Sequence, residues 1–411
     1  MAERRDTSLD FWLTRRRLVS ALGVGVAALG TACSGIGNVG GDLLSSSSTT
    51  PGDQGTTGAL PADGASSTIG EGQTKIALIL PLSASGNAGA AAQAMRNAAE
   101  MALADFNNPD VQLLIRDDGG SPQGAQAAAR QAIEEGAQVI LGPLFAQAVA
   151  AVAPIARSSR IPVIAFSTDS NVATRGVFLL SFLPESDVER VVSYAVSQGR
   201  RSFAALVPDN AYGSAVEAAF RQIVPAKGGR VVAIARYRPD DASMQGPVRQ
   251  IAQAAAGADA LFIPDSGDAV PKVAKLLAAA GVDMRRLQVL GTGLWDDPRI
   301  FSDTTLEGSW FAGPDSAGYK AFATRYRSKF GQDPVRTATL AYDAVALMVA
   351  LAKSQQGQRI TAETLMDPSG FSGIDGVFRF RVDGTNQRGL AVHKVTPGGS
   401  EVISGAPKSF G

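Results

Sequence analysis

Short unbroken apolar runs alternate with longer helical stretches along most of the chain. In the first clear unit, the apolar run Ile76–Leu80 is followed by a small polar loop and then by the alanine-rich stretch Ala90–Ala104. A run of this kind is typical of a strand covered on both faces of a parallel sheet. The loop between strand and helix offers backbone N–H groups and hydroxyls to a polar ligand. Ser83, Ser85 and Asn87 are therefore candidate ligand-binding residues, although any strand–helix unit needs such a turn.

The same alternation continues to residue 183 and restarts at residue 201. Short loops between alternating strands and helices predict an α/β fold with right-handed crossovers and parallel sheets. We expect each of the two parts to form one sheet flanked by helices. Near the C-terminus, the extended runs 376–380 and 390–395 flank Asp383-Gly384 and predict a hairpin-like end.

Composition supports a sizeable core and two domains. The chain has 411 residues, of which 45% are hydrophobic and 18% charged, and its 38 Lys and Arg residues balance 38 Asp and Glu residues. This balance gives no reason to expect nucleic acid as a partner. A single cysteine, Cys33, excludes an internal disulfide.

The N-terminus is typical of an export signal. The arginine cluster Thr14–Val19 resembles a twin-arginine pattern, and the apolar segment that follows is too short to span a bilayer. Leu29–Cys33 resembles a lipobox, with Gly30 where leucine is usual. We expect a signal peptide over 1–32, a lipidated Cys33 and a flexible tether over 33–73. A non-lipidated signal peptide is the alternative, and the export route stays open between the twin-arginine and general pathways.

Motifs of enzyme chemistry are missing from the sequence. It contains no phosphate-binding G-x-x-x-x-G-K-[ST] run and no G-x-S-x-G elbow, and Gly291-Thr292-Gly293 lacks the third glycine of a dinucleotide site. One histidine, His393, and one cysteine make a zinc site improbable. We therefore expect a protein that is not an enzyme and that needs no cofactor or metal.

The order of these pieces resembles the type I periplasmic solute-binding proteins of the branched-chain amino-acid-binding kind. The resemblance extends from Thr74 to Val395. It rests on Leu78–Leu82 with the loop after it, Phe106-Asn107, Val139–Pro143, Ile161–Ile164, Asp209–Gly213, and Gly376–Phe380 before Asp383-Gly384. The family fold implies two lobes joined by crossovers, with a ligand between them. Lobe 1 would comprise 74–183 and 314–370, and lobe 2 would comprise 184–313 and 371–411.

The resemblance places the ligand site on loops that follow strands. In amino-acid binders, hydroxyls and N–H groups after the third and fourth strands hold the carboxylate, and an acidic side chain of lobe 2 commonly holds the ammonium. The candidate ligand-binding residues in this chain, besides the first loop, are Phe145, Ser167, Thr168, Asp169, Tyr212, Asp265 and Trp295. Tyr212 and Trp295 could equally serve interlobe packing, and Asp265 could equally cap a helix.

Two positions depart from the amino-acid binders. Ala146 stands where they carry a carboxylate-binding serine, and Asp169 stands within one residue of their second hydroxyl. An aspartate there would repel a ligand carboxylate. The resemblance implies a lipid-anchored periplasmic protein that delivers an amino-acid-like or amide-like solute to the permease of an ABC-type importer. The alternative is the lipoprotein branch of the same fold that activates penicillin-binding proteins through protein contact.

Overall fold

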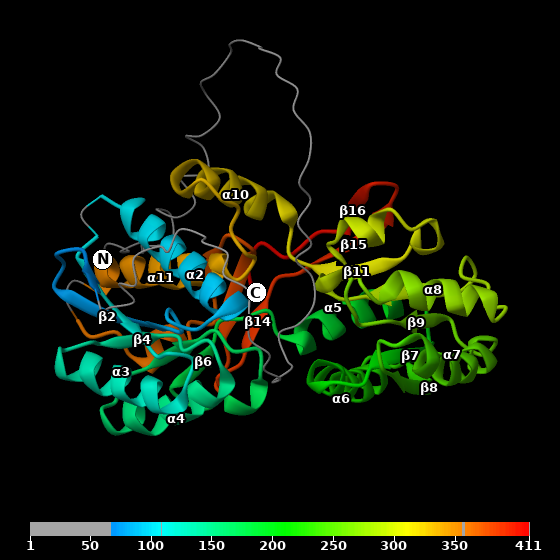
Figure 1. Ribbon diagram of the computed structural model, residues 1–411, viewed down its shortest axis with the longest axis horizontal. Helices are drawn as coiled ribbons and strands as arrows, with labels where there is room; N and C mark the ends of the chain where they lie inside the picture. The colour runs from blue at the N-terminus through cyan, green and yellow to red at the C-terminus, as the bar shows by residue number, and fades with distance from the viewer. Residues whose placement is uncertain (1–66, 108, 356–357, 411) are drawn as a thin grey trace, which may run out of the picture. The chain divides into compact units, whose positions relative to one another are not determined.

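The computed structural model of the protein describes residues 67–107, 109–355 and 358–410, without the side chains of Asp241 and Ala242 (Figure 1). The predicted signal peptide, Cys33 and most of the predicted tether lie outside the described residues. Among the described helices, none combines the length and the apolar character that crossing a membrane requires.

A six-stranded sheet, sheet A, forms the first lobe, in the order β1-β3-β2-β4-β5-β6. All its neighbouring strands are parallel except β1, which pairs antiparallel with β3. The strands are β1 (Ser67–Ile69), β2 (Thr74–Leu80), β3 (Val111–Asp117), β4 (Val139–Leu141), β5 (Val163–Ala165) and β6 (Val177–Leu179). The predicted parallel sheet is confirmed. The predicted end of the tether at residue 73 is wrong, because Ser67–Ile69 already completes the edge of the sheet.

Helices cover both faces of sheet A (Figure 1). Helices α2 (Gly86–Ala104) and α11 (Ala338–Gln355) pack against each other on one face, and α3 (Pro122–Glu134) and α4 (Ala146–Ser158) cover the other. Many contacting side chains are alanines, which let helix and sheet backbones approach closely. Helices α10 (Ser316–Phe330) and α12 (Ala362–Leu365) complete the lobe.

The second lobe is built on the seven-stranded sheet B, in the order β16-β15-β11-β10-β9-β7-β8. The strands from β8 to β11 are parallel, whereas β15 and β16 join antiparallel at one edge. Its strands are β7 (Ser202–Pro208), β8 (Arg230–Tyr237), β9 (Ala260–Phe262), β10 (Gln288–Gly291), β11 (Trp310–Gly313), β15 (Ala391–Thr396) and β16 (Gly399–Ser404). The two parallel sheets flanked by helices therefore confirm the predicted fold class.

Two hydrophobic clusters lie on opposite faces of sheet B. Helices α5 (Pro184–Ser197) and α6 (Ala211–Ala226) cover one face, and α7 (Asp241–Ala255) and α8 (Val270–Ala279) cover the other, with the short α9 (Pro298–Phe301) nearby. Short 3-10 helices occur at 170–172, 293–295 and 304–306.

Trp295 belongs to the core of lobe 2. Its side chain is fully buried among the residues of the α7–α8 face, and its indole N–H donates to the carbonyl of Ile263 at 3.1 Å. A Cβ on Gly291 would lie 2.2 Å from the indole ring, so a glycine is required there. The placement of Trp295 against a ligand is thus wrong, because its ring faces the protein interior.

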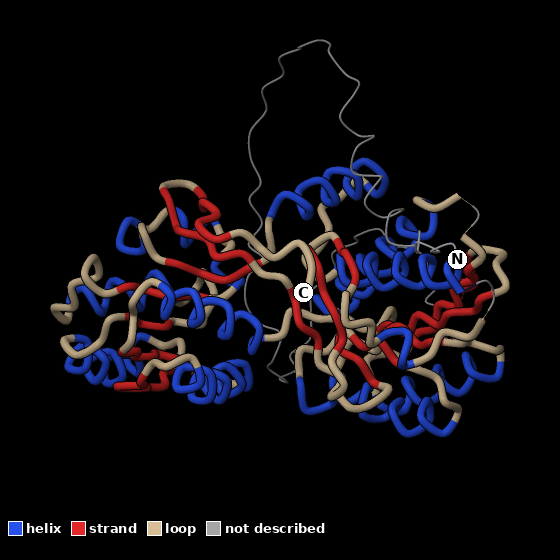
Figure 2. The backbone as a smooth tube through the Cα atoms, turned by 180° about the vertical axis from the view of Figure 1, so that it is seen from behind, coloured by secondary structure: helices blue, strands red, loops and turns tan. Residues whose placement is uncertain are grey.

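A small antiparallel sheet, sheet C, comes between β11 and β15 of sheet B along the chain (Figure 2). It consists of β12 (Phe371–Gly373), β13 (Gly376–Phe380) and β14 (Asn386–Arg388). The predicted hairpin around Asp383-Gly384 exists, but β13 pairs with β14. The run 390–395, predicted as its partner, instead pairs with β11 and β16 in sheet B, so that part of the prediction is wrong.

Sheet C is bonded to lobe 1. The N–H of Leu179 donates to the carbonyl of Gly384, and the carbonyl of Ser181 accepts both the Asn386 amide and Nε of Arg388. Within the described residues, the chain therefore passes between the lobes three times, at 180–183, 314–315 and 389–390. Several crossings at one place are what a hinge between two lobes requires.

Buried charges gather where sheet C meets α11. Asp375 is fully buried and accepts hydrogen bonds from Nη2 of Arg336 and from the hydroxyl of Thr339, both at 2.6 Å. Asp343 accepts the N–H of Ile374 at 2.8 Å with one oxygen, while its other oxygen has no partner among the described residues. Burial, followed by the nearby Asp375, raises the pKa of Asp343 to about 8 against the opposing effects of Arg388 and the Ile374 N–H.

Asp343→Asn should change how stability depends on pH. Because the folded-state pKa of about 8 lies above the ordinary 3.8, Asp343 contributes stability that is fully present below pH 3.8 and lost as pH rises through about 8. Asparagine can still accept the Ile374 N–H and cannot ionise. The melting temperature of the variant minus that of the wild type should therefore rise from pH 4 to pH 8. The exposed Asp367→Asn is the control, and a pH-independent difference for Asp343→Asn would contradict the assignment.

Trp295→Ala should destabilise the protein by roughly 3–5 kcal/mol, because it leaves a cavity in a packed core and frees the Ile263 carbonyl. Its neighbour Leu294 is 46% exposed, so Leu294→Ala should stay within about 0.5 kcal/mol of the wild type. Urea unfolding measures both. A Trp295→Ala variant as stable as Leu294→Ala would show that the ring does not lie in the core.

Candidate functional site

Loops at the carboxyl ends of parallel strands are the usual place for a ligand in an α/β fold. In sheet A the loops after β2, β3 and β4 come together around Gly119 and Gly120, whose φ angles are +56° and +70°. A Cβ on Gly120 would lie 3.6 Å from the ring of Phe145 and 3.7 Å from Cβ of Ala84. The left-handed backbone at both positions explains the Gly-Gly pair, because glycine adopts it without steric cost.

Two of the predicted residues belong to this group of loops. The N–H of Ser83 donates to Oδ1 of Asp117 at 3.2 Å, which fixes the first loop against the β3 end. Phe145 is half-buried and precedes α4. Ser85 and Asn87 are exposed at the start of α2, where Ser85 is the N-cap residue without a side-chain cap bond. The structure therefore places Ser83 and Phe145 around the Gly119-Gly120 pair, while Ser85 and Asn87 have no such contact and are exposed at the start of α2.

The loop after β5 is bonded within itself. Ser167 is buried, and its hydroxyl accepts the N–H of Asp169 at 3.1 Å. Oδ1 of Asp169 accepts the N–H and the side-chain amide of Asn171 at 3.0 and 2.8 Å, so Asp169 caps the short 3-10 helix that follows. Thr168 is exposed between them. Asp169 thus has a local structural role at the position where amino-acid binders carry a hydroxyl.

The first turn of α5 joins this loop to lobe 2. The hydroxyl of Ser170 donates to Oε1 of Glu185 at 2.8 Å, and the N–H of Gly293, after β10, donates to Oδ2 of Asp187 at 3.0 Å. Because α5 directly follows the first crossing, its first turn contacts strand-end loops of both sheets. The second oxygen of Glu185 is buried and has no hydrogen-bond partner among the described residues.

The electrostatic environment of this turn favours a proton on the carboxyl group of Asp187, or a hydrogen-bond donor beside it. Burial raises the pKa of Asp187 to about 7, although the N–H of Gly293 and the nearby Arg388 act in the opposite direction, and the charge of Glu185 raises it further. A cation or an N–H donor from a ligand would lower the pKa of this carboxyl group, because it would stabilise the ionised form.

Lobe 2 contributes a tyrosine and a further carboxylate. The hydroxyls of Tyr212 and the fully buried Thr292 share a hydrogen bond of 3.0 Å. Burial, then the charge of Asp187, raises the pKa of Tyr212, and Asp265 and Glu185 act in the same direction. Tyr212 therefore stays neutral and lies in the field of all three carboxylates.

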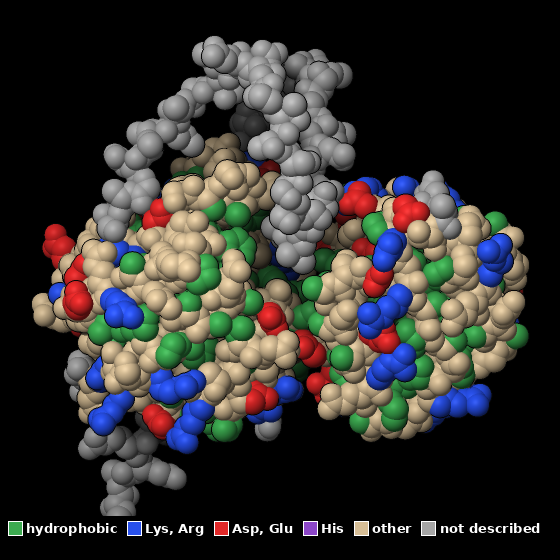
Figure 3. Space-filling model, turned by 60° about the horizontal axis from the view of Figure 1, so that its bottom comes forward, with side chains coloured by type: hydrophobic (Ala, Val, Ile, Leu, Met, Phe, Trp, Pro, Cys, Tyr) green, Lys and Arg blue, Asp and Glu red, His purple; other side chains and the backbone are tan. Residues whose placement is uncertain are grey.

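Asp265 follows β9 and accepts hydrogen bonds from the hydroxyl of Tyr237 and, at 2.7 Å, from the N–H of Ser266. Burial raises its pKa, whereas these hydrogen bonds act to lower it. Asp265 thus acts electrostatically on Tyr212, as Glu185 and Asp187 do, while Trp295 lies in the core of lobe 2. On the face drawn in Figure 3, acidic side chains gather where the two lobes adjoin.

Sequence reasoning missed Glu185, Asp187 and Arg388. The first two follow Pro184 and look like ordinary first-turn acids of a helix, so nothing local marks them as site residues. Arg388 is 5% exposed, its guanidinium lies 4.8 Å from the centre of the Phe182 ring, and its Nη1 and Nη2 have no hydrogen-bond partner among the described residues. The one signal that could have identified Arg388 from the sequence is its position as a charged residue in a short strand, β14.

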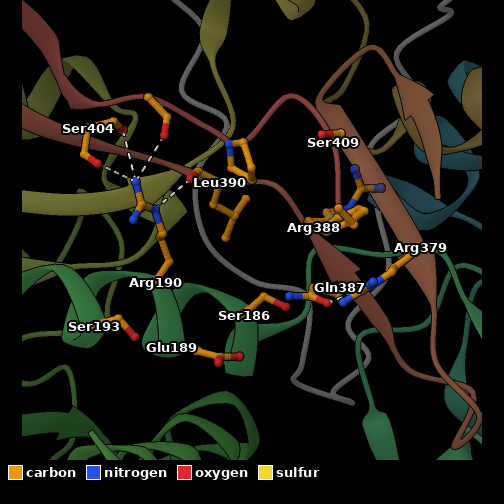
Figure 4. Close-up of a pocket in the computed structure, with 13 residues that line it drawn as sticks. Ser186, Glu189, Arg190, Ser193, Arg379, Gln387, Arg388, Leu390, Ser404 and Ser409 are labelled. Atoms are coloured by element: carbon orange, nitrogen blue, oxygen red, sulfur yellow. Dashed lines mark hydrogen bonds between the residues drawn. The ribbon is translucent and has the colours of Figure 1, made fainter. Parts of the chain in front are cut away.

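A cavity of about 580 Å³ lies beside α5 and is bounded in part by Ser186, in the first turn of that helix, and by Arg388 (Figure 4). It is lined by polar side chains of α5, sheet C and the C-terminal segment, among them Ser186, Glu189, Arg190, Arg379, Gln387 and Ser409. Among the described residues, no three or more His, Cys, Asp or Glu side chains are grouped so that they could hold a metal ion.

Solved structures share this fold. A candidate branched-chain amino acid ABC transporter from Rhodospirillum rubrum has a TM-score of 0.71 at 20% identity, over 80% of this chain and 99% of its own. A branched chain amino acid ABC transporter periplasmic ligand-binding protein from Burkholderia xenovorans has a TM-score of 0.65 at 18% identity, over 82% and 97%. A solute binding protein of an ABC transporter from Rhodopseudomonas palustris, in complex with 3,4-dihydroxy benzoic acid, has a TM-score of 0.60 at 22% identity, over 82% and 97%.

No curated protein is similar enough in sequence to count as a match. A family model described as periplasmic binding protein matches residues 73–400. This match covers nearly all of both lobes, and it confirms the resemblance predicted from the order of motifs. The chain therefore belongs to the periplasmic binding protein family.

Proposed function

We propose that this protein is the solute-binding protein of an ABC-type importer, and that it binds an amino-acid-like or amide-like small polar ligand between its lobes. One observation carries the proposal: strand-end loops of both sheets are hydrogen-bonded to the first turn of α5. A ligand at this turn would contact both lobes at once, so binding would favour a closed arrangement of the lobes. The protein would act by binding and release, without chemistry.

Charge at the turn supports a ligand that donates hydrogen bonds. Glu185, Asp187 and Asp265 all act on Tyr212, and Glu185 keeps one buried oxygen without a partner among the described residues. An ammonium or amide N–H can satisfy that oxygen, whereas a simple carboxylate anion would be repelled. An amino acid or an amide therefore fits this site better than the 3,4-dihydroxy benzoic acid bound in the similar structure from Rhodopseudomonas palustris.

The ligand carboxylate would be held differently from that of ordinary amino-acid binders. Ala146 offers no hydroxyl, and the hydroxyl of Ser167 accepts the N–H of Asp169. The N–H groups of Gly119 and Gly120 already donate to Oδ1 of Asp117 and Oδ1 of Asp118, at 2.9 and 2.8 Å, so they are not free to hold a ligand carboxylate. An amide in place of the carboxylate would relieve the repulsion from Asp169, which is why the proposal includes amides.

Location follows from the family and from the N-terminus. Members of this family act in the periplasm, and the arginine cluster and Leu29–Cys33 support export followed by lipidation at Cys33. A lipidated protein would stay near the permease that receives its ligand. The anchor itself lies outside the described residues and rests on the sequence.

Calorimetry against amino acids and their amides tests the ligand class. We expect saturable binding of at least one of them, and Glu185→Gln should weaken it roughly 10–100-fold, because a charge-assisted hydrogen bond is lost. Glu134→Gln, an exposed carboxylate on α3, is the matched control and should bind as the wild type does. If no solute binds but a penicillin-binding protein is retained by the purified chain, the importer proposal fails and the activator alternative holds.

Replacement of Cys33 tests the anchor. Lipid attached to this cysteine would keep the mature chain in the membrane fraction, and Cys33→Ser should release it into the soluble periplasmic fraction and abolish labelling by radioactive palmitate. Ser34→Ala, one residue later, should change neither result. Membrane retention of Cys33→Ser would show that another segment holds the protein.

A further inference from the structure

The C-terminal segment runs from lobe 2 to sheet C. Strand β16 forms the edge of sheet B and ends at Ser404, after which the chain continues to Phe410 beside β13. The guanidinium of Arg379 lies 4.7 Å from the centre of the Phe410 ring, and a Cβ on Gly370 would lie 2.8 Å from that ring. Since sheet C is bonded to lobe 1, this segment is a further link between the lobes beside the three crossings.

Arg190 holds the beginning of this segment (Figure 4). From α5, its Nε donates to the carbonyl of Leu390 at 2.7 Å, and its Nη2 donates to the hydroxyl of Ser404 at 2.7 Å and to the carbonyls of Ser404 and Gly405, both at 3.2 Å. One side chain thereby joins the helix after the first crossing, the third crossing at Leu390, and the C-terminal segment.

The middle of the segment lies against the third crossing. A Cβ on Gly389 would be 3.0 Å from Cγ and 3.1 Å from the carbonyl oxygen of Pro407. Any rotation of the lobes must change the backbone at the crossings, and here Pro407 packs directly on one of them. The seven residues from Ser404 to Phe410 make six backbone steps and span at most roughly 20 Å, which sets the greatest separation of the two ends of the link.

Space for movement exists on one side. The 580 Å³ cavity lies between the middle of the segment and parts of α5 and sheet C, with Ser409 and Phe410 in its wall. Polar and charged side chains line most of it, beside Leu390, Pro407 and Phe410, so this space is not a packed core. The segment can therefore shift when the lobes rotate, within the limit set by its two attached ends.

We propose that residues 404–410 form a strap that limits the rotation of the two lobes, with Arg190 as the positioning residue at one end and the Arg379–Phe410 contact at the other. The strap lies beyond residue 400, where the match to the family model ends. The proposal rests on the proposed function in one respect, since a limit on rotation matters for binding only if the lobes close on a ligand.

Spin labels in the two lobes test the strap without any ligand. Ala90 on α2 and Gln222 on α6 are exposed, and both can be changed to cysteine in the full chain carrying Cys33→Ser. Pulsed electron paramagnetic resonance then gives the distribution of distances between them. Phe410→Ala and Arg190→Ala should each broaden this distribution. The exposed Lys408→Ala, in the strap, and Arg249→Ala, on α7, are the matched controls and should leave it unchanged.

A chain that ends at Gly405 provides the second variant if Arg190→Ala does not fold. Its distance distribution should be broader than that of the full chain. If the distributions of this chain and of Phe410→Ala both superimpose on that of the full chain, the strap proposal is overturned. The result is separable from the proposed function. Failure of amino acids and amides to narrow the wild-type distribution would count against the ligand, whereas broadening in the strap variants would still support the strap.

Discussion

The first turn of α5 is the constraint on which the site depends. Its two carboxylates are held by donors from different sheets, Glu185 by the Ser170 hydroxyl and Asp187 by the Gly293 N–H. Removing carboxylates from water is unfavourable unless hydrogen bonds replace the lost hydration. The protein supplies one bond to each group and leaves an oxygen of Glu185 without a partner among the described residues, which is the arrangement expected where a ligand completes the set.

The charged residues buried at the chain crossings also act through directional hydrogen bonds. Three buried charged residues lie where sheet C, α11 and the chain crossings meet: Asp375, Asp343 and Arg388. Both carboxylate oxygens of Asp375 are hydrogen-bonded, whereas one oxygen of Asp343 and two nitrogens of Arg388 have no partner among the described residues. A hydrophobic core at this place would give more stability, because buried ion pairs seldom exceed the cost of their desolvation. Directional bonds to Ser181 and Ile374 instead fix how the crossing segments lie. Together with the strap, they define the part of the molecule about which the lobes can turn.

The fold could be predicted from sequence, whereas the site could be predicted only in part. Apolar runs such as Ile76–Leu80 specify buried parallel strands by themselves, so the lobes and their alternation followed directly. Tyr212 and Asp265 could be proposed from the sequence, because the ends of strands are marked locally by loop residues. Glu185 and Asp187 were not, since their role arises from bonds to residues 15 and 106 positions away. Trp295 failed for the opposite reason: it follows a strand, but its ring turns back into the core.

The central claim is that loops of both lobes close on a ligand at the first turn of α5. Hydrogen–deuterium exchange, measured with and without a saturating amino acid or amide, tests it most directly. The account predicts that amides over 166–173, 184–190 and 291–296 gain protection together, because the three segments meet at that turn. Protection confined to one lobe would contradict it.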